Sequence, residues 1–393
     1  MDSKKRTIIT SSVVTLAVLG LAFSFAAVVH FPNPKPRQLT DTRVNLVTST
    51  SAMSSGRVPS ANILPSGYGW VLTTAGLELT SNGGSSFTIA QSPIPTPNIH
   101  DVAVNGKHIH IAGVINGSPV IELSNDSGAT WNVMNLPKGS GNAGIAQFVT
   151  ESGTVVGMLV TDVTSSNFSS GEWYSTLDGG LTWAHNEMPA AGVVTAANGN
   201  LWLVAGPQFR TLYKSSNHGT TWAKVTTPDS ASSNAEAFSI PGQFLNGDMV
   251  LVATEMNLAS ASKFGVTIYL SSDLGATWQV STHTAFAGQI NSGEVITSGI
   301  YGESIWLGSA TDQKILIISS DGTMTSTSST NAIFPGGGIY SITPTENSTA
   351  WVTAMSDQCP SGKASCTEVG TLLKTVDSGK SWSIVNLTPA TTS

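Results

Sequence analysis

The residue types that most often bind metals or act as nucleophiles do not form a recognisable catalytic pattern in this sequence. The chain has 393 residues, with 7 His and 2 Cys. The histidines are scattered, and His108 and His110 alternate within an apolar run, which is typical of strand residues rather than of metal ligands. The sequence contains no Gly-rich phosphate loop, no HExxH helix and no Ser-centred nucleophile elbow. We therefore predict neither a cofactor nor a metal site.

Cys359 and Cys366 lie close together near the end of the chain. Two cysteines are too few for a disulfide scaffold or a thiolate metal cluster. No His stands near them, so a metal at this point would lack further ligands. In an exported chain, a disulfide that closes the loop between them is the favoured interpretation, and a metal site is the alternative.

One eight-residue phrase, with Asp or Asn at its third position, recurs along the chain. Full copies span residues 124–131, 176–183, 215–222, 271–278 and 375–382; a softer copy spans 80–87, and 319–323 is a degenerate copy without Trp. The aligned Asp or Asn residues are Asn82, Asp126, Asp178, Asn217, Asp273, Asp321 and Asp377. These side chains could bind a metal or a ligand. An Asp also accepts hydrogen bonds from turn N–H groups, however, and the Gly permits positive φ. We predict fold-stabilising turns.

The spacing of the phrase predicts a repeat architecture, because copies follow one another at an average of about 49 residues. Between copies, short apolar runs are joined by hairpin turns such as Asn198-Gly199. A Trp recurs on the second run of several units, at Trp70, Trp202, Trp306 and Trp351. Four strands per unit describe a propeller blade. We therefore predict an all-β, seven-bladed β-propeller over residues 44–393.

The phrase resembles the Asp-box, the S-x-D-x-G-x-T-W signature of the bacterial-neuraminidase-repeat family. The resemblance extends from Leu77 to Trp382. In that family the box is a turn inside a propeller blade, which implies the same fold here. It also implies that the Trp packs its ring against the neighbouring sheet.

The first segment predicts an export signal. Lys4, Lys5 and Arg6 precede an uncharged stretch, residues 7–31, which is long enough as a helix to cross a bilayer. We favour an uncleaved signal anchor over residues 1–31, with cleavage near Ala22–Ser24 as the alternative. Residues 32–43 are a Pro-rich linker. The propeller is then expected outside the cytoplasm, held to the membrane by this helix.

Composition limits the partners of the chain. Its net charge is -7, which argues against nucleic acid, because phosphate binding needs clustered Lys and Arg. Only 10% of residues are charged, so the surface must be covered mainly by neutral polar side chains. Such a surface suits an acidic medium, and drift in an exported, Ser/Thr-rich chain is the alternative explanation.

The long insertions of the sequence fall into one class of loop. If the strands of a blade are named A to D from the channel outward, the box joins C to D and lies on the face of the A–B turns. The long segments join B to C or D to the next A, for example residues 161–171, 254–265 and 356–370. Insertions on one face commonly mark a binding face.

The best-known Asp-box enzymes are sialidases, and the resemblance implies candidate catalytic residues. Residues 56–59 are similar to the Arg-Ile-Pro motif of that family, which makes Arg57 a candidate for gripping a substrate carboxylate. Tyr340 stands where the family places its nucleophile, and Asp101 is a candidate general acid. Glu236 and Glu294 stand at the expected starts of A strands, where a Glu could polarise the Tyr.

The arginine count departs from this pattern. A sialidase holds its substrate carboxylate with three arginines. The globular part here has Arg57 and Arg210, with Arg43 at its edge. The chain also resembles non-catalytic Asp-box propellers, namely sortilin-type receptors and photosystem-assembly factors. We therefore expect a binding or assembly scaffold for a protein or glycan on the B–C/D–A loop face, with a sialidase-like exo-glycosidase as the alternative.

Overall fold

The computed structural model describes residues 60–385 apart from short gaps at 65, 74–75, 137–141, 152–153, 164–170, 207–209, 227–234, 239–240, 257–262, 288–295, 310–311, 331–332, 334–337, 347 and 359–366. The predicted anchor, the linker and the Cys359–Cys366 pair lie outside the described residues. Within them, no helix is long and apolar enough to span a membrane. The predicted topology and disulfide therefore stay predictions.

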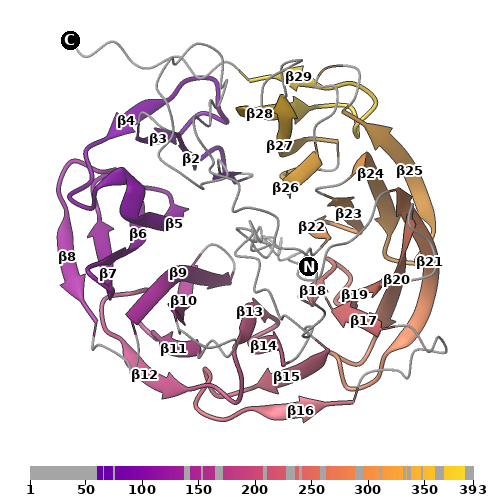
Figure 1. Cartoon of the computed structure of the whole chain (residues 1–393), viewed down its shortest axis with the longest axis horizontal. Helices are drawn as coiled ribbons and strands as arrows, with labels where there is room; N and C mark the ends of the chain where they lie inside the picture. The colour runs from indigo at the N-terminus through magenta and orange to yellow at the C-terminus, as the bar shows by residue number, and fades with distance from the viewer. Residues whose placement is uncertain are drawn as a thin grey trace, which may run out of the picture.

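Seven antiparallel sheets stand around a common centre, which confirms the predicted seven-bladed propeller (Figure 1). Each sheet is a meander of strands consecutive in the chain, so that the first strand lies nearest the centre and the last forms the rim. Blade 5 differs from the prediction, because its inner strand is split into two pieces, β17 and β18, that both pair with β19.

The strands of blades 1 to 3 are β1 (Ser60–Ile63), β2 (Gly69–Leu72), β3 (Leu77–Thr80), β4 (Thr88–Ala90), β5 (Ile99–Asn105), β6 (His108–Ile115), β7 (Ser118–Ser124), β8 (Asn132–Asn135), β9 (Asn142–Glu151), β10 (Thr154–Val163), β11 (Gly171–Ser175) and β12 (Ala184–Glu187), with a 3-10 turn η1 (Thr96–Asn98) before β5. Those of blades 4 and 5 are β13 (Gly192–Ala197), β14 (Asn200–Ala205), β15 (Thr211–Ser215), β16 (Ala223–Val225), β17 (Ala235–Phe238), β18 (Gly242–Gln243), β19 (Met249–Met256), β20 (Lys263–Ser271) and β21 (Gln279–Ala287). Blades 6 and 7 contain β22 (Thr297–Tyr301), β23 (Ser304–Ser309), β24 (Asp312–Ser319), β25 (Met324–Ser329), β26 (Gly338–Pro344), β27 (Ala350–Gln358), β28 (Thr367–Thr375) and β29 (Ser383–Ile384).

The core lies between the blades. Within the described residues, each pair of neighbouring blades shares one apolar cluster, such as the cluster of Phe148, Met158 and Tyr174 with Ile121 between blades 2 and 3. Strand side chains alternate between the two faces of a sheet, so each blade is apolar toward both neighbours. Burial between sheets is therefore what holds the ring together.

Among the described residues, the ring closes where side chains of blades 1 and 7 pack together. Among the described strands, blade 1 contains β1 to β4 and blade 7 contains β26 to β29, so each is formed from one end of the described chain. β1 packs against β26 and β27, and the shared cluster includes Ile63 and Phe87 of blade 1 with Trp351 and Leu372 of blade 7.

The repeated box is a tight turn between the third and fourth strands. Two consecutive residues in it have positive φ: Ser127 and Gly128 have φ of 60° and 88°, and Leu274 and Gly275 have φ of 59° and 82°. The sequence predicted positive φ at the Gly alone. The residue before the Gly is also left-handed, although it is Ser127 in one box and Leu274 in another. The surrounding hydrogen bonds must offset the cost of this backbone conformation.

Candidate functional site

The box carboxylates are bonded inside their own turns. Asp273 shows the pattern: its Oδ1 accepts from Ser271 Oγ and from the Thr277 backbone N, both at 2.8 Å, and its Oδ2 accepts from Thr277 Oγ1 at 2.6 Å. Asp126, Asp178 and Asp377 repeat this arrangement. Both oxygens of each carboxylate therefore have partners within the box.

The degenerate box and the Asn boxes are also closed by side-chain hydrogen bonds, but different atoms donate and accept. Asp321 Oδ1 accepts from Ser319 Oγ, Thr323 N and Thr323 Oγ1 in a shortened turn. In the fourth copy, Asn217 Oδ1 accepts from Thr221 N at 3.0 Å, while its Nδ2 donates to Thr221 Oγ1 at 2.9 Å. The hydroxyl thus accepts a hydrogen bond where it would donate one to an Asp. Asn is therefore a working substitute in this turn.

These hydrogen bonds favour the ionised form and lower the pKa of five box aspartates, Asp126, Asp178, Asp273, Asp321 and Asp377, to about 2. Within the described part of the chain, no group of three or more His, Cys, Asp or Glu side chains is placed to hold a metal ion. The arrangement fits turns better than ligand sites.

Asp273 provides a direct test of this role. We expect Asp273→Ala to lower the urea midpoint at pH 6, because three donors lose their acceptor, and Asp273→Asn to preserve most of the stability, as Asn217 does in its own box. A folded-state pKa below the unfolded value gives stability that is present above the unfolded pKa and is lost as the pH falls through about 2. The urea midpoint of the wild type should therefore fall to that of Asp273→Asn near pH 2. Equal midpoints for Ala and Asn at pH 6 would contradict the turn role.

The box glycines touch the preceding blade. A Cβ on Gly219 would overlap Trp173 of blade 3, and one on Gly275 would overlap Trp202 of blade 4. The Trp173 indole N–H donates to the carbonyl of His218 in the next blade at 2.9 Å. Each such box therefore packs closely against an aromatic side chain of the preceding blade.

His110 takes this role between blades 2 and 3. It lies on β6, the second strand, where other blades carry Trp, and its Nε2 is 2.8 Å from the Gly179 carbonyl oxygen. Its ring also meets Phe148 edge to face at 5.9 Å. Burial lowers the pKa of His110. The sequence predicted His110 only to be a strand residue. Alignment of the repeats could have shown that it occupies the second-strand position that other blades fill with Trp.

Asp101 is half-buried where blade 2 meets blade 3. Its Oδ1 accepts from the backbone N of Val102 and its Oδ2 from the backbone N of Phe148 on β9, both at 2.8 Å. The preceding residue, His100, sits at a bulge in β5, and its Nδ1 accepts from Ala146 N at 3.1 Å. Desolvation outweighs the two hydrogen bonds and raises the pKa of Asp101 to about 7.

The other candidate residues are spread around the ring. Tyr340 lies at a bulge of β26, the inner strand of blade 7, which is separated from Asp101 by blade 1. Arg210 is exposed just before β15, the third strand of blade 4. Arg57 and Glu294, together with Arg43, lie outside the described residues. Glu236 lies on β17, in the inner strand of blade 5. Asp101, Tyr340 and Arg210 thus come from three blades and from two different layers of strands.

Two histidine–glutamate pairs are the ion pairs seen between described residues. His185 Nε2 lies 3.7 Å from Glu172 Oε2 in blade 3, and His283 Nδ1 lies 3.5 Å from Glu255 Oε1 in blade 5. Each is an ion pair only when the imidazole is protonated.

Comparisons with known proteins identify a fold. The sequence matches no protein-family profile, and no curated protein matches it. Among solved structures it is similar to an ancestral GH74 enzyme, with a TM-score of 0.51 and 14% identity over 88% of this chain and 55% of that one. It is also similar to a prolyl endopeptidase, with a TM-score of 0.51 and 11% identity over 84% of this chain and 49% of that one. The chain thus spans about half the length of both, and the likeness shows a propeller fold.

Proposed function

We propose that this chain is an extracytoplasmic Asp-box propeller, anchored by its N-terminal helix, that binds a protein or glycan partner on the B–C/D–A loop face without catalysing a reaction. The Asp-box assignment rests on the turn itself, in which Ser or Thr, Asp, Gly and a second hydroxyl residue each have a bonding role. Location outside the cytoplasm rests on the basic start and apolar stretch of residues 4–31.

One asymmetry between the two faces of the ring carries the proposal. On the box face, the first and second strands of a blade are joined by tight turns, such as the one between β13 and β14. At the opposite ends of the strands the connections are longer in sequence, with seven residues between β10 and β11 and eight between β27 and β28. Loops displayed by a rigid scaffold are the usual carriers of recognition.

The geometry of Asp101 supports binding over hydrolysis. A general acid must reach the leaving-group oxygen of its substrate. Both oxygens of Asp101 instead hold backbone N–H groups of Val102 and Phe148, which is a structural task. A sialidase-like exo-glycosidase, using Arg57, Asp101, Arg210, Tyr340 and Glu294, remains the second candidate, since one of the similar solved structures is a GH74 enzyme.

Hydrolysis of a fluorogenic sialoside separates the two candidates. We expect no turnover by the purified protein above the buffer rate, because loss of even one charge-assisted carboxylate bond costs about 1.5–3 kcal/mol, or roughly ten- to a hundredfold in rate. Turnover that disappears in both Tyr340→Phe and Arg57→Ala would establish the enzyme instead. Variants with unchanged turnover would point to a contaminating hydrolase.

Binding is tested on an array of immobilised glycans with the same protein. We expect retention that weakens in a Cys359→Ser/Cys366→Ser variant, because the proposed disulfide fixes the longest loop of blade 7. A matched change on the box face, Asn198→Ala, should leave retention unchanged. Equal loss in both variants would place recognition away from the loop face.

A further inference from the structure

The outer strands of the blades differ in length and in charge. Among the described strands, the outer strand has two to four residues in blades 1 to 4 and 7, six in blade 6 and nine in blade 5, where it is β21. β21 contains no Lys, Arg, Asp, Glu or Pro. Natural edge strands are usually kept short or carry charges, because their unpaired N–H and C=O groups can bind another strand. β21 has neither of these protections.

The outer edge of β21 is accessible. No described strand pairs with it on the side away from β20. Five of its side chains are exposed, at positions 279–281, 283 and 285. A bulge is a further device that protects an edge, and β21 has one at Ser281. The bulge lies near the start of the strand, however, so residues 282–287 pair with β20 in regular register and leave a regular outer edge.

An apolar pair lies beside this edge. The shortened box of blade 6 packs on β21, since a Cβ on Gly322 would overlap the Ser281 hydroxyl. Val280 of β21 and Met324 of β25 adjoin this contact and are 60% and 54% exposed. They are the most exposed large apolar side chains among the described outer strands. Contact with a second protein surface would remove both from water.

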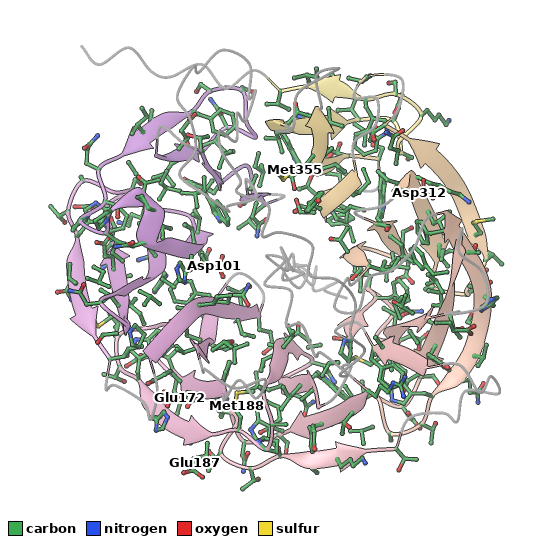
Figure 2. The ribbon with its side chains drawn as sticks, viewed as in Figure 1. Asp101, Glu172, Glu187, Met188, Asp312 and Met355 are labelled. Atoms are coloured by element: carbon green, nitrogen blue, oxygen red, sulfur yellow. The ribbon has the colours of Figure 1, made fainter. Side chains whose placement is uncertain are left out.

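Charge favours a second copy of this chain as the partner on this edge. The net charge is -7, so two copies repel one another unless they meet where neither carries net charge. The titratable side chain on β21 is His283, which lies 3.5 Å from Glu255 Oε1 and neutralises it when protonated. Glu187, at the rim of blade 3 (Figure 2), and Lys224 lie on shorter outer strands. A two-fold contact there would bring each of these charges close to its own copy.

The shape of the ring sets the direction of such a pairing. Figure 1 shows the outer strands following the rim of the ring. When two rings lie side by side and a two-fold axis runs parallel to their central axes, the strands along the facing rims run in opposite directions. β21 of one copy can then add to β21 of the other as an antiparallel strand, and two blades become one continuous sheet.

We propose that the outer edge of β21 is a self-association surface, at which two copies of this chain pair antiparallel through blade 5, with Val280 and Met324 packed beside the paired strands. The surface lies on the rim, so the proposal goes beyond partner binding on the loop face. One strand pair with two apolar side chains is small against the roughly 1,000 Å² that a stable interface buries. The dimer is therefore weak in solution, and a shared membrane anchor would raise its effective concentration.

Sedimentation equilibrium of the full chain in density-matched detergent tests the proposal. We expect the mass to rise from one copy to two with protein concentration. Ala285→Lys places a charge at an exposed position of the edge, close to its own copy across the two-fold axis, and should weaken dimerisation about tenfold or more. Val133→Lys is the matched control, because Val133 is 45% exposed on the four-residue outer strand β8. It should dimerise as the wild type does.

A mass of one copy at every concentration, or equal weakening in both lysine variants, would overturn the proposal. Hydrogen exchange of the wild type needs no variant: amides of β21 should exchange more slowly at high than at low protein concentration, while those of β8 stay unchanged. Unchanged exchange in β21 would refute the strand pairing even if a dimer forms. Retention on the glycan array concerns the loop face, so its failure and the failure of this proposal are distinguishable.

Discussion

Replacing Gly275 by alanine is expected to destabilise the ring by about 2–5 kcal/mol. Its φ is 82°, where any other residue is strained by roughly 1–2 kcal/mol. A Cβ there would also overlap Cη2 of Trp202, whose ring is buried and packs edge to face on Trp278 at 6.2 Å. Because the Trp202 ring is buried against Trp278, we expect overpacking to add about 1–3 kcal/mol. Urea unfolding monitored by tryptophan fluorescence measures the loss.

Gly199→Ala is the matched control. Gly199 also has a positive φ, 68°, in the turn between β13 and β14, but a Cβ there meets no atom within 4 Å. Its N–H, which donates to Glu151 Oε1 at 2.6 Å, is kept by alanine. We expect a loss of about 1 kcal/mol from backbone strain alone. Equal losses at the two positions would show that the contact between box and Trp contributes nothing.

Trp351→Ala is expected to open the ring at its closure and to cost about 3–5 kcal/mol, as buried Trp truncations do. Trp351 lies on β27, its ring meets Gly84 in the first box of blade 1, and Lys374 Nζ lies 4.5 Å from the ring centre. Other neighbouring blades are also joined by the chain, whereas the described residues of blades 7 and 1 meet through side-chain packing. Hydrogen exchange should rise together in β1, β2, β27 and β28.

Trp306→Ala provides the comparison, because Trp306 is equally buried between blades 6 and 7, which the chain connects. We expect a similar loss of side-chain packing but faster exchange confined to β23, β24 and β26. An increase in the radius of gyration by small-angle scattering is expected for Trp351→Ala alone. The same exchange pattern in both variants would mean that closure is no weaker than the other seams.

The number of repeats and the strand layout of a blade could both be predicted from the sequence. Those properties rest on chemistry within about ten residues: Asp273, Gly275 and Thr277 form their turn with one another, and Asn198-Gly199 closes its hairpin without help from elsewhere. Local signals of this kind are repeated in each unit, so a weak copy such as residues 319–323 can be recognised by its place in the series. The strand order follows, because consecutive strands joined by tight turns pair with one another.

The contacts of the individual polar residues could not be predicted from the sequence and are seen in the folded ring. The sequence predicts Asp101 as a candidate general acid, but Phe148, whose backbone N–H it binds, belongs to the next blade. The pKa of Asp101 depends on how far that blade removes its carboxyl from water. His110 bonds to Gly179 across the same seam, and Arg210 lies on a different layer of strands from Asp101. Such contacts join residues of separate repeats, whose approach depends on the packing of whole sheets. A periodic sequence fixes each blade, whereas desolvation and partner choice arise between blades, where the sequence holds no local signal.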